Sequence, residues 1–419
     1  MAGILKVLTI AALSGILIAV VGIVYRYNTF KPSRLSIPPS PQALRYFQES
    51  HERCRSGFLS AVAKAATVRG DIESKTIGDP GAVGTAPPID HCHIPARDAP
   101  KRLLILSSAI HGVEGYVGSA VQQLFLAELL GVPDEGTTGV LLIHGINAHG
   151  FIHNRRVSEG NVDLNRNCMP AGGSYAIENG GYSDLDSLLN PRGEVRARSL
   201  RNLFFPLRAM GKIAVHGMPA LRQAILQGQY RFERGIFYGG KGLEGAIAAV
   251  APLIRETAAP YESVLHIDIH SGYGRRGTLH LFAGPPGSGT RARQLEHIFE
   301  GTPIDWGGGG DFYTVTGDFG SYVGSLLPEK HFLSMVFEFG TLDSHTTFGA
   351  IHSLHNLVLE NQGAHFGYAS PEDAAEVGRR FLEGYFPSSP AWRAKAIRDA
   401  REILGRAIRA YQTLPLPAG

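Results

Sequence analysis

Short apolar runs that alternate with a helical stretch organise the first half of this 419-residue chain. The run over Arg102–Leu106 is followed by a helical stretch over Glu114–Leu130 and then by a second run, Gly139–Ile143. Runs of about five apolar residues bounded by loops are typical of strands buried on both faces. A strand, a helix and another strand in this order indicate a βαβ unit, so the sequence predicts a largely parallel sheet.

The rest of the chain extends the same architecture. Further strands are predicted over Ser263–Ile269, Thr278–Phe282 and Ser334–Phe339. Helices are predicted over Gln42–Val68 and Ala391–Tyr411, and the apolar face of the second helix should pack on its own domain. Residues 171–234 are polar and irregular, then helical, which favours an elaborated loop over one end of the sheet. We therefore expect a single α/β domain over residues 42–419, with a twisted mixed, largely parallel sheet and helices on both faces.

The N-terminus carries an uncharged apolar run, Val7–Val24, flanked by Lys6 and Arg26. At about 1.5 Å per residue, a helix of this length just crosses a hydrocarbon core of about 30 Å. No clear cleavage site follows the run, so a single-pass membrane anchor over residues 1–26 is preferred to a removed signal segment. A Pro-rich linker over residues 27–41 then tethers the domain. The flanking positive charges differ too little to fix the side of the membrane on which the domain lies.

Composition excludes several classes of protein. The net charge is only +3 and no Lys/Arg cluster stands out, so nucleic acid is not an expected partner. Three cysteines (Cys54, Cys92 and Cys168) cannot form a disulfide framework, although one bridge stays possible. The tract Asp90–His93 contains side chains that could bind a metal, but it lacks a second pair of ligands at zinc-finger spacing, so we expect a surface turn there. Gly284–Arg291 nearly spells a phosphate-binding loop but lacks its lysine, which predicts a glycine turn and no nucleotide site.

Two groups of metal-binding side chains follow predicted strands. His111 and Glu114 come directly after the first strand, at the carboxyl edge where parallel sheets bind ligands. In His266-Ile-Asp268-Ile-His270 the alternation places the polar side chains on one face of a strand, with His270 at its end and His266 in the core. Two His and one Glu leave a coordination position for water, as in catalytic Zn²⁺ sites. The sequence thus predicts His111, Glu114 and His270 as the ligands of one zinc ion per chain.

Glu338 lies in the otherwise apolar stretch Phe337–Thr341. A carboxylate in such a strand is costly unless it has a partner or a task. Beside a zinc-bound water, Glu338 would be the general base and would later protonate the leaving amine. The alternative interpretation is a buried ion pair with an arginine.

A polar loop carries two arginines, Arg155 and Arg156, and then Asp163, Asn165 and Arg166. A guanidinium group binds carboxylates or developing oxyanions through paired hydrogen bonds. Asp163 could instead hold a ligand imidazole in the right tautomer, a role that zinc-binding histidines commonly require.

In order and spelling, these motifs resemble the carboxypeptidase A-like zinc metallopeptidases: H-x-x-E, D-x-N-R-N, I-H-S, a loop with a tyrosine, and a Glu in an apolar strand. The resemblance covers residues 100–345 and is closest to an uncharacterised bacterial branch of that superfamily. It implies that fold and a metallocarboxypeptidase activity on peptides. By this resemblance, His111, Glu114 and His270 match the zinc ligands, Asp163 matches the carboxylate behind the first zinc histidine, and Glu338 matches the general base. Asn165 and Arg166 match the pair that binds the substrate's terminal carboxylate, and Tyr313 matches the tyrosine of the mobile loop. Arg156 is preferred to Arg155 as the arginine that polarises the scissile carbonyl, which leaves Arg155 to bind substrate.

Two other functions are weighed against a carboxypeptidase. An N-acyl amino acid deacylase resembling the succinylglutamate desuccinylases and aspartoacylases would use a similar H-x-x-E and D-L-N-R set, and would prefer small N-acyl amino acids to long peptides. A catalytically inactive binding module is disfavoured, because no catalytic position is visibly lost from the sequence.

Overall fold

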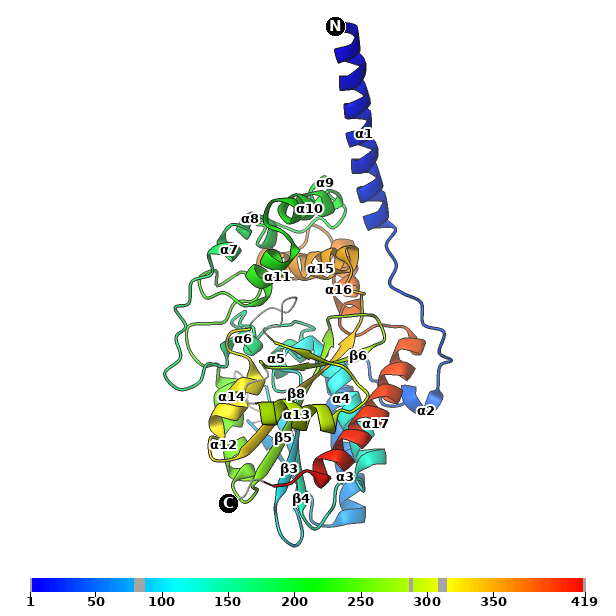
Figure 1. Ribbon diagram of the computed structural model, residues 1–419. Coiled ribbons are helices and arrows are strands. Elements are labelled where there is room, and N and C mark those ends of the chain that lie inside the picture. Colours follow the sequence, from blue (N-terminus) through cyan, green and yellow to red (C-terminus); the bar gives the residue numbers. More distant parts are fainter. Residues whose placement is uncertain (1, 79–86, 286–288, 308–314, 417–419) are drawn as a thin grey trace.

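The computed structural model describes residues 2–78, 87–285, 289–307 and 315–416 (Figure 1). The strands are β1 (Glu73–Ile77), β2 (Ile89–Ile94), β3 (Arg102–Ser108), β4 (Thr138–His144), β5 (Ser263–Gly272), β6 (Leu279–Ala283), β7 (Ile304–Trp306) and β8 (His331–Gly340). The helices are α1 (Ala2–Asn28), α2 (Pro41–Leu44), α3 (His51–Arg69), α4 (Gly115–Leu124), α5 (Ala148–Ile152), α6 (Leu164–Asn167), α7 (Gly180–Ser183), α8 (Asp186–Leu189), α9 (Leu200–Leu203), α10 (Phe205–His216), α11 (Met218–Leu226), α12 (Gly245–Ala258), α13 (Gly289–Ile298), α14 (Phe319–Leu326), α15 (Thr347–Phe366), α16 (Pro371–Glu383) and α17 (Pro390–Thr413). A 3₁₀ turn, η1 (Gly112–Glu114), precedes α4, and a π-helical turn, η2 (Phe125–Leu129), follows it.

The described strands form one mixed sheet in the order β1-β2-β4-β3-β5-β8-β6-β7. The central pairs β4–β3, β3–β5 and β5–β8 are parallel, whereas β1–β2, β2–β4 and β6–β8 are antiparallel. The chain leaves β3 to build β4 on one side and later returns to build β5 on the other. Such a reversal opens a crevice at the carboxyl ends of the strands. The predicted central strands are confirmed.

Helices cover both faces of the sheet, as predicted. In β3, Leu104 and Leu106 belong to the apolar core shared with α3, α4 and α17, while Leu103 and Ile105 belong to the core shared with α12 and α14. This alternation is the two-residue period of a strand that is buried on both sides. Figure 1 shows α12 and α14 on one side of the sheet and α4 and α17 on the other. The α/β fold class is therefore confirmed.

A helical cap covers the carboxyl end of the sheet. It is formed by α7 to α11 together with α15, and these helices lie at the same end of the molecule as α1 (Figure 1). The predicted elaboration over residues 171–234 is thus confirmed, with five short helices in it.

Two local predictions need correction. The tract Asp90–His93 is not a surface turn but part of β2, where it pairs with both β1 and β4. The polar side chains of this tract are stable within a strand because they have hydrogen-bond partners. Asp90, for example, accepts two hydrogen bonds from Arg55, at 2.6 and 2.9 Å. The helix expected over Gln42–Val68 is interrupted after α2 and restarts at α3, whose N-cap is Ser50. The three cysteines are all free and buried, so no bridge forms among them.

Among the described residues, α1 is the one helix long and apolar enough to cross a membrane, over Ile4–Asn28 with a mean hydropathy of 2.7. An N-terminal signal sequence meets the same criteria. The last turn of α1 contacts the body: the Tyr27 hydroxyl lies 2.5 Å from Nδ1 of His355, and its ring stacks on His352. Residues 30–40 form no helix or strand, yet the backbone N–H of Ser33 donates to the domain. Part of the predicted linker therefore contacts the rest of the chain.

Candidate metal centre

The turn after β3 brings two polar side chains to the carboxyl edge of the sheet. Ala109 adopts a left-handed conformation (φ 59°), and the chain then passes through His111 into η1, which ends at Glu114. A Cβ added at Gly112 would lie 2.1 Å from the carbonyl carbon of Gly150, so only glycine fits this close approach. The tight turn fixes the direction of both side chains.

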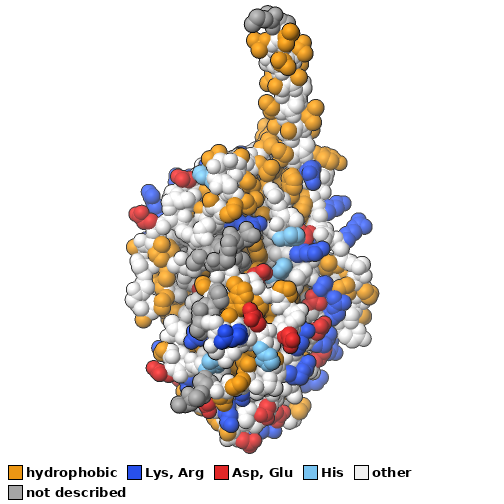
Figure 2. All heavy atoms as spheres, viewed as in Figure 1, with side chains coloured by type: hydrophobic (Ala, Val, Ile, Leu, Met, Phe, Trp, Pro, Cys, Tyr) orange, Lys and Arg blue, Asp and Glu red, His pale blue; other side chains and the backbone are white. Residues whose placement is uncertain are grey.

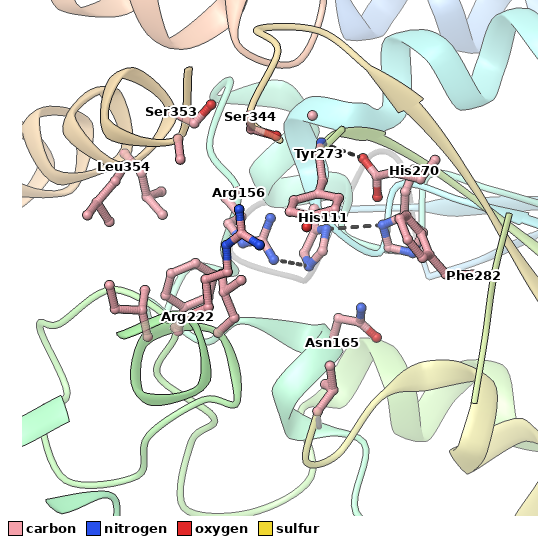
Figure 3. A pocket seen from close by; sticks show the side chains of 18 of the residues that line it. His111, Arg156, Asn165, Arg222, His270, Tyr273, Phe282, Ser344, Ser353 and Leu354 are labelled. Carbon is pink, nitrogen blue, oxygen red and sulfur yellow. Dashed lines mark hydrogen bonds between the residues drawn. The ribbon is translucent and has the colours of Figure 1, made fainter. Parts of the chain in front are cut away.

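Three donor atoms converge at this edge. Nδ1 of His270, at the end of β5, lies 3.2 Å from Nδ1 of His111 and 2.9 Å from Oε2 of Glu114. Oε1 of Glu114 lies 2.9 Å from Nδ1 of His111. All three residues are buried, and Figure 3 shows the two rings side by side, joined by a dashed line. Zinc–nitrogen bonds of about 2.0–2.1 Å in a tetrahedral site separate the ligand atoms by roughly 3.3 Å, so this set fits zinc.

A carboxylate stands behind each imidazole. Nε2 of His111 lies 3.2 Å from Oδ1 of Asp163, and Nε2 of His270 lies 2.8 Å from Oδ2 of Asp268. At His270, a carboxylate that accepts from Nε2–H leaves the lone pair on Nδ1 free for a metal, whereas Nε2 of His111 is approached by both Asp163 and Arg156. The structure thus places Asp163 where it was predicted. The equivalent position of Asp268 was missed, although its alternation with His270 in β5 already placed both on one face.

The charges at this centre favour a cation. Burial raises the pKa of Glu114, but the charges of His111 and His270 outweigh it and hold that pKa below the ordinary value. Burial lowers the pKa of His270, yet Asp268 and Glu114 together raise it well above the ordinary value. The carboxylates therefore stabilise positive charge between the three donors. A divalent cation would supply that charge in place of protons.

The structure separates the two neighbouring arginines. Arg156 is buried in the site, where Nε donates to Asp163 at 2.9 Å and Nη2 lies 2.6 Å from Nε2 of His111 (Figure 3). Arg155 instead donates to Glu360 of α15 at 2.8 Å. Arg156 is thus the arginine that lies next to His111, and its predicted role toward the scissile carbonyl stays a prediction.

Glu338 lies on β8, the strand beside β5, in register with His270. Its Oε1 accepts a hydrogen bond from the backbone N–H of Tyr273 at 2.8 Å. Burial and then the negative charge of Glu114 raise the pKa of Glu338 to about 8. Among the described side chains, Glu338 forms no salt bridge with an arginine, so the alternative of a structural ion pair lacks its partner.

Asn165 and Arg166 also line the site, and both are held by backbone groups. Oδ1 of Asn165 accepts from the N–H of Phe319 at 2.8 Å. Arg166 donates to the carbonyl oxygens of Asn165 and Leu226 at 2.7 and 2.8 Å. Tyr313, predicted in the mobile loop, lies outside the described residues.

The donors lie in a cavity of about 510 Å³ that Arg156 and Glu338 also line. Two further lining residues were not anticipated. Arg222 comes from cap helix α11, and Tyr385, which follows α16, lies near Arg156. Neither residue belongs to a local sequence motif. Both reach the site through the packing of helices that are distant in sequence from the metal donors.

Solved structures with similar folds include bovine thrombin-activatable fibrinolysis inhibitor (13% identity, TM-score 0.45, covering 80% of this chain and 99% of that one). Others are carboxypeptidase A from Helicoverpa armigera (12%, 0.42, covering 88% and 81%) and a metallo-carboxypeptidase from Burkholderia cenocepacia (12%, 0.36, covering 76% and 71%). The last two are described as a carboxypeptidase A and a metallo-carboxypeptidase.

No curated protein sequence matches this chain. A family profile described as "Protein of unknown function (DUF2817)" matches residues 47–399, which is most of the chain and includes every metal-donor residue. The chain therefore belongs to the DUF2817 family.

Proposed function

We propose that the protein is a zinc-dependent hydrolase that cleaves an amide bond next to a free carboxylate, with metallocarboxypeptidase activity as the first candidate. The observation that carries this proposal is the convergence of His111, Glu114 and His270 beside Glu338 in one cavity. Two histidines and one carboxylate are a catalytic zinc set, because they leave a position for water.

The residues around the donors have separate tasks in this reaction. A zinc ion bound by the three donors would polarise the carbonyl and lower the pKa of a bound water. Glu338 takes the proton from the attacking water and passes it to the leaving nitrogen. Arg156, a buried cation beside His111, hydrogen-bonds the carbonyl oxygen as negative charge develops there.

The other predicted residues would hold the substrate. Asn165 and Arg166 line the cavity on the side of α6 and α14, where they would bind the substrate's carboxylate. Tyr313 would close over the substrate. Arg155, paired with Glu360, is better suited to hold the loop that carries Arg156 than to bind substrate directly.

Two substrate classes fit this chemistry, peptides and N-acyl amino acids. A screen of zinc-loaded protein should show release of a carboxyl-terminal amino acid from at least one of them. Amidation of the terminal carboxylate removes the charged partner of Arg166 and is expected to lower kcat/KM by about 10- to 100-fold. Equal turnover of free and amidated substrates would contradict the carboxylate assignment, and no amide hydrolysis at all would contradict the proposed function.

We further propose that α1 anchors residues 42–419, the hydrolase domain, to a membrane through residues 27–41. The full-length protein should then remain with membranes after alkaline washing, because α1 exposes an apolar surface of spanning length. A truncated protein that begins at Arg26 keeps the packed Tyr27 and should be soluble. Mass spectrometry distinguishes an anchor from a cleaved signal. Recovery of the intact chain, with its N-terminus uncut, in the soluble fraction would contradict the anchor.

A further inference from the structure

The lining of the cavity differs from one part to another. Near the metal donors it includes Asn165, Arg166 and Asp318, and Arg166 donates to the carbonyl oxygen of Leu226 at the end of α11. Beneath the cap the cavity extends as a chamber between α8, α10, α11 and α15. The chamber is lined mainly by aliphatic side chains, including Leu188, Ile213, Leu221, Ile225, Ile351 and Leu354. A substrate that occupies both parts of the cavity would therefore carry a charged group near the metal donors and an apolar group beneath the cap.

The chamber is better suited to an alkyl chain than to a peptide. Its walls are helices, which use their backbone N–H and C=O groups within themselves. They present no free strand edge to an extended peptide backbone, and a buried peptide group without partners is costly. Of the polar side chains at the chamber, Lys212 donates to the carbonyl oxygen of Asp184 at 2.9 Å and Asn356 donates to that of Arg380 at 3.1 Å. Arg222 and Ser353 also line the cavity, among a majority of apolar side chains.

The cap lies where a membrane surface would be. Helix α1 contacts α10, and Figure 1 shows α9 and α10 beside the base of α1. Figure 2 shows hydrophobic side chains continuing from α1 onto the neighbouring surface of the body. On these two cap helices, Leu200 and Val215 are 71% and 76% exposed. The segment 200–216 carries Arg201, Arg208 and Lys212 and no acidic residue, a composition that favours an anionic lipid surface.

We propose that the substrate is an N-acyl amino acid with a long alkyl chain drawn from the membrane, and that the chamber beneath α10, α11 and α15 receives this chain. The inference rests on the proposed amide hydrolysis and selects N-acyl amino acids, the second of its two substrate classes, over peptides. Water adds to the acyl carbon and the C–N bond breaks. The acyl group leaves as a fatty acid, and the nitrogen takes a proton to leave as the free amino acid. No oxidant, reductant or second substrate is needed.

The first test varies chain length at a constant amino acid. Zinc-loaded truncated protein is assayed with acetyl, butyryl, octanoyl and lauroyl derivatives below their micelle-forming concentrations. Each CH₂ group that enters the chamber raises kcat/KM by up to about fourfold. We expect at least a 100-fold rise from acetyl to lauroyl. A flat profile with measurable acetyl hydrolysis, or a preference for peptides with bulky residues over acyl chains, would overturn the proposal.

A matched pair of variants on α10 tests where the alkyl chain of the substrate binds. Ile213→Trp narrows the chamber, whereas Val215→Trp changes an exposed position on the same helix. Ile213→Trp should lower kcat/KM for the lauroyl substrate at least tenfold and for the acetyl substrate less than twofold, and Val215→Trp should leave both nearly unchanged. Retained acetyl hydrolysis shows that the variant is folded. Equal effects of the two variants on the lauroyl substrate would overturn the proposal, and Leu354→Trp repeats the test from α15.

A binding measurement separates this inference from the proposed function. Calorimetry with Glu338→Gln protein should show that the lauroyl derivative binds at least 100-fold more tightly than the acetyl derivative, and that Ile213→Trp removes this difference. If tight lauroyl binding occurs while wild-type protein hydrolyses no amide, the chamber stands and the proposed reaction fails. If acetyl substrates are hydrolysed but lauroyl binding is no tighter than acetyl binding, the reaction stands and the chamber proposal fails.

Discussion

Glu338→Gln is expected to lower kcat by about 10²- to 10⁴-fold while zinc content stays at the wild-type level. The glutamine keeps the size of the side chain, and its amide oxygen can still accept the hydrogen bond from the N–H of Tyr273. What it removes is the group that accepts the proton of the attacking water. Because the three metal donors are complete without Glu338, the metal should be unaffected.

Glu360→Gln is the matched control for this variant. Glu360 is also a buried glutamate, but it pairs with Arg155 and lies outside the cavity lining. Its substitution should change stability and leave turnover per bound zinc within a few-fold of wild type. Near wild-type turnover of Glu338→Gln, or loss of its zinc, would show that Glu338 is not the base. It would then be a ligand or a structural carboxylate.

The second large effect is expected from His270→Ala, which should lose zinc and activity together. Without His270, only His111 and Glu114 remain as protein ligands, and two donors are too few to hold the ion at the carboxyl edge of the sheet. His266→Ala is the control, because His266 is equally buried on the same face of β5 but hydrogen-bonds to Ser107 at 2.7 Å. The His266→Ala variant should lose about 1–3 kcal/mol of stability, because the buried hydroxyl of Ser107 is left without this partner, and it should keep its zinc.

The core of the fold was predictable because its strands are apolar on both faces. β3, β4 and the apolar part of β5 read as uninterrupted hydrophobic runs, and their order along the chain indicates parallel pairing. The convergence of His111, Glu114 and His270 was predictable for a related reason. Each of them follows or ends such a strand, so all three are expected at the carboxyl edge of the sheet. This prediction needs no information on loops or side-chain packing.

What the sequence concealed depends on tertiary partners. β2 looks like a polar tract because Asp90 takes part in an ion pair with Arg55, a residue of α3 that local patterning does not connect to it. The choice between Arg155 and Arg156 depends on Glu360, which lies some two hundred residues further along. Tyr385 and the cap residues reach the cavity only through helix packing, which no local spacing encodes.

Zinc analysis of the wild-type protein and His270→Ala, by elemental content and zinc K-edge X-ray absorption, tests the central claim most directly. The wild type should bind about one zinc per chain, with nitrogen and oxygen ligands at about 2.0–2.2 Å, and His270→Ala should bind nearly none after identical loading. A wild-type protein that takes up no zinc, a spectrum with sulfur ligands at about 2.3 Å, or full zinc content in His270→Ala would contradict the metal centre and the hydrolase built on it.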